Sequence, residues 1–363
     1  MKAKDITQTI ESVAPVAYQE SYDNSGWITG NPEAEVSGIL VSVDMTMEVL
    51  DDAIEHGENL IITHHPLIFK PLKKIVKGDY VQDILLKAIK HDIMIYSAHT
   101  SLDNAWTGVN RELFNRLGLR DFKILKPQKD ILRKLVVFVP EDHADHVRES
   151  MFKAGAGQIG EYDSCSYNLK GHGSFRPGEG TNPFVGEKNK IHFESEQRVE
   201  TVLPVHLQRK VLNAMQDAHP YEEVAYDIYS LDNANEQVGS GAIGRLETPL
   251  AFQEFLNYVK ERLDIQVLRY SGSANNVSTV AISGGAGSFL IPDAIKNGAD
   301  VFLTADLKYH DFFMATNELA LVDAGHYETE QFTKHLIRDI LIENFSNFAV
   351  RISQVKTNPV KYY

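Results

Sequence analysis

Two adjacent histidines, His64 and His65, end an apolar run in the first third of the chain. Neighbouring side chains leave an extended backbone in opposite directions, so this pair suits two adjacent metal ions better than one. The alternative is a pair of ordinary surface or core-edge histidines, because histidine is often merely structural. Other residues of the chain must decide between the two interpretations.

Three further residues have the types and spacing to complete a metal site. Asp103 follows a second apolar segment, where the commonest role of a loop aspartate would be to cap a helix. His326 and Glu330 are four positions apart, ahead of a helical apolar pattern, so they lie one turn apart on one side. Glutamate can bridge two ions. With the histidine pair, these residues form a set of the size needed for two ions with open positions for water.

Other polar residues are candidates for the pocket around the ions. His99 could orient a ligand, face a substrate or simply pack, and Lys308 or His310 could steady a phosphate or carbonyl group. The segment 283–288 places glycines between a strand and a helix. Such a loop can aim backbone N–H groups at an anion, although this one lacks the lysine of a P-loop.

The segments that carry these residues repeat a β-α-β pattern. Mostly apolar strands indicate burial on both faces and hence a parallel sheet, where ligands gather beyond the carboxyl ends of the strands. Asp103 would then lie beside the histidine pair. The pattern predicts helices over 6–20, 47–56 (closed by Gly57) and 80–90, and strands over 36–43, 59–62 and 93–96.

The character of the sequence changes from about residue 132. The order β-α-β-β-α-β predicts a ferredoxin-like split motif, with a long connection at 177–183. The stretch His219-Pro220-Tyr221-Glu222-Glu223 has the composition of a metal cluster, but a turn before a strand explains it equally well. The predicted elements are strands over 134–140, 162–169, 191–203 and 224–229 and helices over 144–154 and 206–217.

The last third returns to the β-α-β pattern, with strands predicted over 277–282, 300–303 and 319–322. The candidate ligands come from both flanking sections and none from the middle. We therefore expect a discontinuous α/β metal-binding body, residues 1–127 plus 236–363, and an inserted α+β domain, residues 128–235.

Composition limits the number of domains, the kinds of metal site and the partners that the chain can have. The chain has 363 residues and 43% hydrophobic content, which can bury a sizeable core and fits about two domains. Its single cysteine, Cys165, excludes zinc-finger and iron–sulfur sites. A net charge of −14 without basic runs disfavours duplex nucleic acid as a partner. Charged residues at the N-terminus and the lack of long apolar stretches predict a cytoplasmic protein without membrane spans.

Five motifs together resemble the family of GTP cyclohydrolase 1 type 2 homologues, also called NIF-three-like dinuclear metal proteins, over essentially the whole chain. They are Tyr22-Asp23-Asn24-Ser25-Gly26-Trp27, Thr63-His64-His65-Pro66, Ala98-His99-Thr100-Ser101-Leu102-Asp103, Thr304-Ala305-Asp306-Leu307-Lys308-Tyr309-His310-Asp311 and Asp323-Ala324-Gly325-His326-Tyr327-Glu328-Thr329-Glu330. The resemblance implies two divalent metals on the same five ligands. It also implies an inserted domain similar to PII-type signalling trimers, and a homohexamer built as a trimer of dimers. Ala305 and Ser283 depart from the family, which usually has Gly and often Cys there, and both could alter the pocket wall.

Three classes of function follow. The first is a metal-dependent hydrolase that acts on a nucleotide or a phosphorylated small molecule through a metal-activated water. The others are a metal-binding or metal-delivery protein without turnover, and a regulatory assembly whose inserted domain senses a ligand. Histidine and carboxylate ligands suit zinc, which we expect first, as well as iron and manganese.

Overall fold

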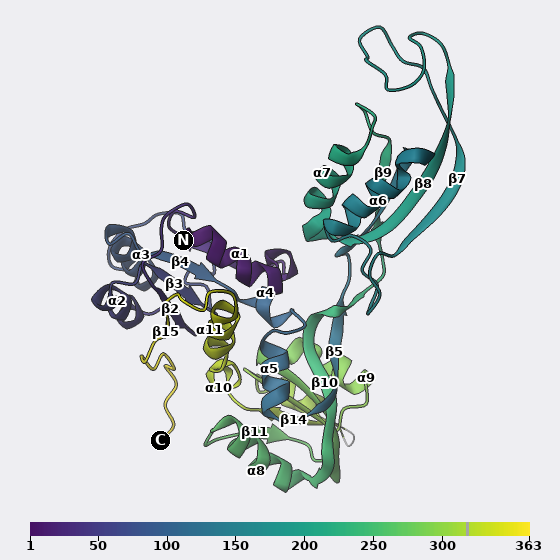
Figure 1. The fold of residues 1–363 in the computed structure, drawn as a ribbon. Helices are drawn as coiled ribbons and strands as arrows, with labels where there is room; N and C mark the ends of the chain where they lie inside the picture. Colours follow the sequence, from purple (N-terminus) through teal and green to yellow (C-terminus); the bar gives the residue numbers. More distant parts are fainter. Residues whose placement is uncertain (317–318) are drawn as a thin grey trace. The chain divides into compact units, whose positions relative to one another are not determined.

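The computed structural model describes residues 1–316 and 319–363. Contacts divide the chain into two compact units, which are Met1–Pro127 together with Gln237–Tyr363, and Gln128–Glu236 (Figure 1). Each unit has its own hydrophobic core. Within the described residues, none of the helices has the length and apolar character needed to cross a membrane.

The first sheet of the discontinuous unit has the strand order β1-β4-β3-β2-β15. Strands β15, β2, β3 and β4 are parallel, and β1 is antiparallel. The inner strands β2, β3 and β4 are mostly apolar and fully buried, as expected for a parallel sheet. Helices α1 and α11 cover one face and α2 and α3 the other. The elements are α1 (Ala3–Val13), η1 (Val16–Tyr18), β1 (Gly26–Thr29), β2 (Ile39–Ser42), α2 (Met47–His56), β3 (Leu60–Thr63), α3 (Tyr80–Lys90), β4 (Met94–Ser97), α4 (Thr100–Asp103), α5 (Val109–Arg116), α11 (Thr333–Asn344) and β15 (Val350–Ile352).

Local sequence signals explain where these helices begin and end. Thr46 caps α2 by accepting a hydrogen bond from Val49 N, and Gly57 ends it in the left-handed conformation, as predicted. Helix α1 stops at Val13, earlier than the predicted residue 20. Pro15 is the cause, because the residue before a proline avoids helical geometry and proline cannot continue the hydrogen-bond ladder.

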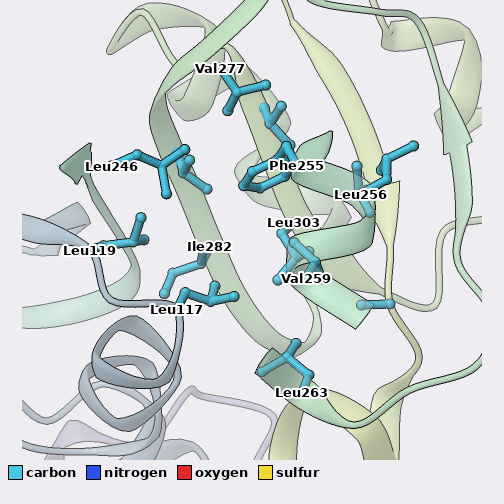
Figure 2. Packing of buried hydrophobic residues seen from close by; sticks show 14 of the residues in the cluster. Leu117, Leu119, Leu246, Phe255, Leu256, Val259, Leu263, Val277, Ile282 and Leu303 are labelled. Carbon is cyan, nitrogen blue, oxygen red and sulfur yellow. The ribbon is translucent and has the colours of Figure 1, made fainter. Parts of the chain in front are cut away.

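The second sheet of this unit has the order β11-β14-β13-β12-β10-β5, with β12, β13 and β14 parallel. Figure 2 shows Phe255 and Val259 of α8 beside Leu303 of β13, in the core on one face. Helix α9 covers the other face. The elements are β5 (Arg120–Gln128), β10 (Asn235–Ala251), α8 (Phe252–Leu263), β11 (Arg269–Ser271), β12 (Asn276–Ala286), η4 (Ser288–Leu290), α9 (Ile291–Lys296), β13 (Val301–Ala305), η5 (Asp311–Met314), β14 (Ala320–Asp323) and α10 (His326–Glu330).

Strand β10 was not predicted, and it begins at the predicted boundary between the two domains, residues 235 and 236. It lies between β12 and β5, so its backbone hydrogen bonds are supplied by neighbours remote in sequence. A Cβ at Gly244 would meet Phe114 and the Arg120 carbonyl at about 2.5 Å or less. Close packing against a neighbouring strand, rather than local propensity, therefore places this segment in the sheet.

The unit Gln128–Glu236 has the element order β6-α6-β7-β8-α7-β9, which matches the predicted β-α-β-β-α-β. Its antiparallel sheet has the order β7-β8-β6-β9, and α6 and α7 pack on one face (Figure 1). The elements are β6 (Leu132–Pro140), η2 (Glu141–His143), α6 (Ala144–Lys153), β7 (Ser166–Phe175), β8 (His192–Pro204), η3 (Val205–Leu207), α7 (Gln208–Ala218) and β9 (Tyr226–Leu231).

An ion-pair network fastens edge strand β15 to α2 and predicts a pH effect. Arg351 lies 2.8 Å from Asp52 and 2.6 Å from Glu58. Burial would raise the pKa of Asp52, but hydrogen bonds from Arg351 and Ser353 hold it below its ordinary 3.8. Because the folded pKa is the lower one, the stabilisation is full well above pH 3.8 and is lost as the pH falls.

We expect Asp52→Asn to lower the free energy of unfolding by about 1 kcal/mol near pH 7 and by clearly less near pH 3. Urea titration of both proteins at each pH measures the difference. Asp51→Asn is the matched control, because its carboxylate pairs at the surface with Lys87 instead. A penalty for Asp52→Asn that does not change with pH would contradict the assignment.

Candidate metal centre

The candidate ligands meet beyond the carboxyl ends of parallel strands. His64 and His65 follow β3 directly, and their N–H groups both donate to the carbonyl of Val43 after β2. Asp103 ends α4, the single turn that follows β4. His326 and Glu330 begin and end α10, which follows β14. The expectation that adjacent strand ends bring Asp103 beside the histidine pair agrees with the geometry, whereas His326 and Glu330 arrive from the second sheet.

The other four side chains surround the carboxylate of Glu330, which is 3% exposed. Its Oε2 atom lies 2.9 Å from His65 Nε2 and 3.1 Å from His326 Nε2. Its Oε1 atom lies 3.6 Å from His64 Nε2, which is itself 3.6 Å from Asp103 Oδ1. The donor atoms therefore form two groups that share Glu330, one with His64 and Asp103 and one with His65 and His326.

Each histidine in the two groups uses its other ring nitrogen to hold its orientation. His65 Nδ1 donates to Asp44 at 2.7 Å, and His326 Nδ1 donates to Asp306 at 2.7 Å. His64 Nδ1 donates to the carbonyl of Ala98 at 3.0 Å. These bonds turn every Nε2 atom toward the shared carboxylate, which is how metal-binding histidines are oriented in proteins. Sequence reasoning missed Asp44 and Asp306, since isolated aspartates carry no spacing signal.

The electrostatics of this cluster favour positive charge beside Glu330. Two buried atoms, His64 Nε2 and Asp103 Oδ1, have no hydrogen-bond partner among the described residues. Burial and the nearby Glu330 raise the pKa of Asp103 well above its ordinary value. Burial would also raise the pKa of Glu330, but the surrounding imidazoles hold it well below its ordinary value. An imidazole nitrogen and a carboxylate oxygen that lack hydrogen-bond partners are donor types that bind divalent metal ions.

A glycine makes room for the shared carboxylate. A Cβ at Gly285 would lie 2.2 Å from Glu330 Oε1, and the residue has a φ of +57°. The backbone N–H groups of Gly284 and Gly285 donate to the side chains of Asn110 and Thr329. These donors are therefore occupied, so the loop packs against Glu330 instead of presenting them to an anion.

The cluster opens into a cavity of about 990 Å³. His99 lines it, with its ring 5.4 Å from the rings of both His64 and His65 and its Nδ1 donating to Asp23 at 2.6 Å. Ser283 also lines the cavity, whereas Ala305 is buried in β13. Lys308 and His310 are exposed and are not among the lining residues, so the structure does not bring them to the cluster.

Comparisons with known proteins agree over the full length. The family model for Duf34/NIF3 (NGG1p interacting factor 3) matches residues 1–359. A protein of Halalkalibacterium halodurans named GTP cyclohydrolase 1 type 2 homolog is 40% identical, covering 98% of each chain. A Bacillus subtilis protein of the same name is 38% identical over 100% of this chain and 99% of its own. The crystal structure of a Bacillus cereus protein related to NIF3 has a TM-score of 0.87 at 39% identity, covering 100% of this chain and 99% of that one. With these matches, and with the resemblance of its motifs confirmed, the chain belongs to the Duf34/NIF3 family.

Proposed function

We propose that this protein binds two divalent metal ions, one held by His64 and Asp103 and one by His65 and His326, with Glu330 bridging them. The observation that carries this proposal is the orientation of Glu330, whose two carboxylate oxygens face separate groups of donors. Zinc is the metal we propose first, and iron and manganese suit the same donor types.

We propose a hydrolase reaction in the adjoining cavity. When bound, divalent ions supply Lewis acidity that polarises a substrate oxygen and makes a coordinated water acidic. His99, held by Asp23, is placed to transfer a proton to or from a substrate in the cavity. Arg269 is the only lysine or arginine among the described lining residues, and it already pairs with Asp323. A nucleotide or other phosphorylated substrate would therefore depend on the metals to bind its phosphate.

A non-catalytic role in metal binding or delivery is the second candidate. The same ligands support it, and it differs from the first in that the cavity and His99 would be dispensable. Turnover therefore separates the two functions.

Substitution of the ligands tests the division of their work. Glu330→Gln keeps the shape but removes the negative charge that offsets two dications, so we expect lower occupancy of both ions. His64→Ala and His65→Ala should each chiefly empty one. Metal content per chain is the measurement, with a thermal melt to show that the variants fold. His91→Ala, at an exposed position after α3, is the control. If Glu330→Gln retained both ions at unchanged affinity, the bridging role would be wrong.

Gly285→Ala should lower metal occupancy although Gly285 itself offers no ligand atom. Its methyl group would displace the Glu330 carboxylate. Gly298→Ala is the matched control: Gly298 has a similar φ of +70°, but a Cβ there has nothing within 4 Å. Both variants should lose about 1 kcal/mol of stability from backbone strain, and only Gly285→Ala should lose metal. Equal metal content in the two variants would contradict the role assigned to Gly285.

Activity is tested with the full chain loaded in turn with zinc, iron(II) or manganese, using GTP and p-nitrophenyl phosphate as probes. We expect hydrolysis with at least one metal, and a loss of about a hundredfold or more in His99→Ala at unchanged metal content. Turnover that is unaffected in His99→Ala would exclude its proton-transfer role. Absence of turnover with every metal and probe would favour the non-catalytic candidate.

We further propose that the chain forms a homohexamer, a trimer of dimers, in which the unit Gln128–Glu236 is PII-like and makes the three-fold contact. Support comes from the sheet face opposite α6 and α7, where large exposed side chains alternate with those facing the helices. They are Tyr167, Leu169 and Tyr229. Apolar side chains gathered on one face commonly mark an interface.

Light scattering of two chains tests this assembly and the domain division. The full chain should have a hexameric mass, and a chain with Gln128–Glu236 replaced by an Asn-Gly turn a dimeric mass. The ends of this deletion are close together, because β5 and β10 are neighbours and Gly241 lies near Leu125. A monomeric full chain at micromolar concentration would contradict the proposed hexamer. An unfolded shortened chain would contradict the domain division.

A further inference from the structure

The unit Gln128–Glu236 contains a cavity of about 610 Å³ that the metal site does not use. In β8, Val199 and Leu203 belong to the core beneath α6 and α7. Alternation along the strand places Glu196 and Arg198 on the opposite face, and both line the cavity. The cavity therefore lies on the sheet face opposite α6 and α7, which is also the face of the proposed three-fold contact, and Leu169 belongs to both.

Glu196 is the unusual residue in this cavity. It is 8% exposed, and its Oε1 atom accepts a hydrogen bond from the Tyr221 hydroxyl at 3.2 Å. No cationic group of the described residues forms an ion pair with it, although buried glutamates are almost always paired. Burial raises the pKa of Glu196 despite the hydrogen bond from Tyr221, as expected for a carboxylate that lacks a counter-charge.

The neighbouring strand makes room for this carboxylate. Gly171 and Gly173 of β7 lie on the cavity side, and a Cβ at Gly173 would lie 2.2 Å from Glu196 Oε2. An alanine here would therefore displace the carboxylate. The missing side chain lets Glu196 pack against β7 while it lines the cavity.

Aromatic rings form a corner beside the same carboxylate. The Tyr221 ring lies 5.8 Å from Phe175 at an interplanar angle of 60°, and 6.3 Å from Phe184 at 49°. All three rings line the cavity, and they are inclined to one another, whereas a flat ligand would need parallel rings on its two sides. The loop that carries Phe184 is fixed by a hydrogen bond from Asn182 N to Glu222, 2.9 Å long.

We propose that this cavity binds a small organic cation, a primary alkylammonium group, between the Glu196 carboxylate and the aromatic corner of Phe175, Phe184 and Tyr221. An ammonium supplies the counter-charge that Glu196 lacks, and its N–H groups can donate to Glu196 Oε2 and to the Tyr221 oxygen. The faces of aromatic rings attract such a cation further.

The basic residues of the lining do not oppose a cation strongly. Lys170 lies 3.1 Å from Glu141, and Arg198 lies 3.0 Å from Glu200, so both charges are offset by carboxylates outside the lining. Arg176 is exposed and also lines the cavity. An anionic ligand bound through Arg176 is therefore the competing class, which the experiment includes.

The experiment compares three probes of similar size on the full chain, n-butylammonium, 1-butanol and butyrate, by ligand-observed NMR titration. We expect n-butylammonium to bind about tenfold or more tightly than 1-butanol, and butyrate not to compete with it. Stronger binding of butyrate, or equal binding of the ammonium and the alcohol, would overturn the proposal.

Two variants and a control locate the site. Glu196→Gln should abolish the preference for the ammonium and melt no lower than the native chain, because it removes an unpaired buried charge. Gly173→Ala should weaken ammonium binding by displacing the Glu196 carboxylate. Glu149→Gln, at an exposed position on α6 outside the lining, should leave binding unchanged. Unaltered ammonium binding in Glu196→Gln would overturn the assignment. So would a change in the oligomeric mass of that variant, since the cation would then come from another copy of the chain.

Discussion

The candidate metal centre is organised around one buried negative charge, the carboxylate of Glu330. A carboxylate that is 3% exposed is costly unless opposite charge or strong donors surround it, and here three imidazoles do so. The three imidazoles come from the ends of two strands in different sheets, β3 and β14. The site therefore exists only when both sheets are formed and correctly placed, which ties the chemistry to the fold of the whole unit.

Helix α11 supplies much of that placement. It continues the chain from α10, which carries His326 and Glu330, and it packs its Ile337 and Leu341 into the core of the first sheet. The chain then returns as β15 to the edge of that sheet, beside β2. Apolar burial of this kind, at about 1.5–3 kcal/mol for each large side chain, offsets the cost of gathering several charged groups at one point. The hydrophobic core thus holds the ligands in position.

Glu330 and Glu196, the two carboxylates on which our proposals rest, are both buried, but their surroundings shift their pKa values in opposite directions. Glu330 lies among imidazoles that hold its pKa low, whereas Glu196 accepts one tyrosine hydroxyl and has a raised pKa. Both stand against a glycine that leaves room for an oxygen, Gly285 in one case and Gly173 in the other. In each unit, a buried acid and the space left by a missing side chain together indicate where a positively charged ligand would bind.

The sequence alone determined the strands and helices with strong periodicity, and through them the five candidate ligands. Parallel strands deliver their carboxyl ends to one edge, and His326 and Glu330 are fixed one turn apart by helical geometry, so these are local consequences of spacing. Only the tertiary structure decided the rest. Strand β10, the orienting carboxylates Asp44 and Asp306, and the contact of Gly285 with Glu330 all depend on partners distant in sequence. The same is true of the exclusion of Lys308 and His310 from the cavity. Periodicity encodes which face of an element is buried, but it carries no information on which remote side chain that face will meet.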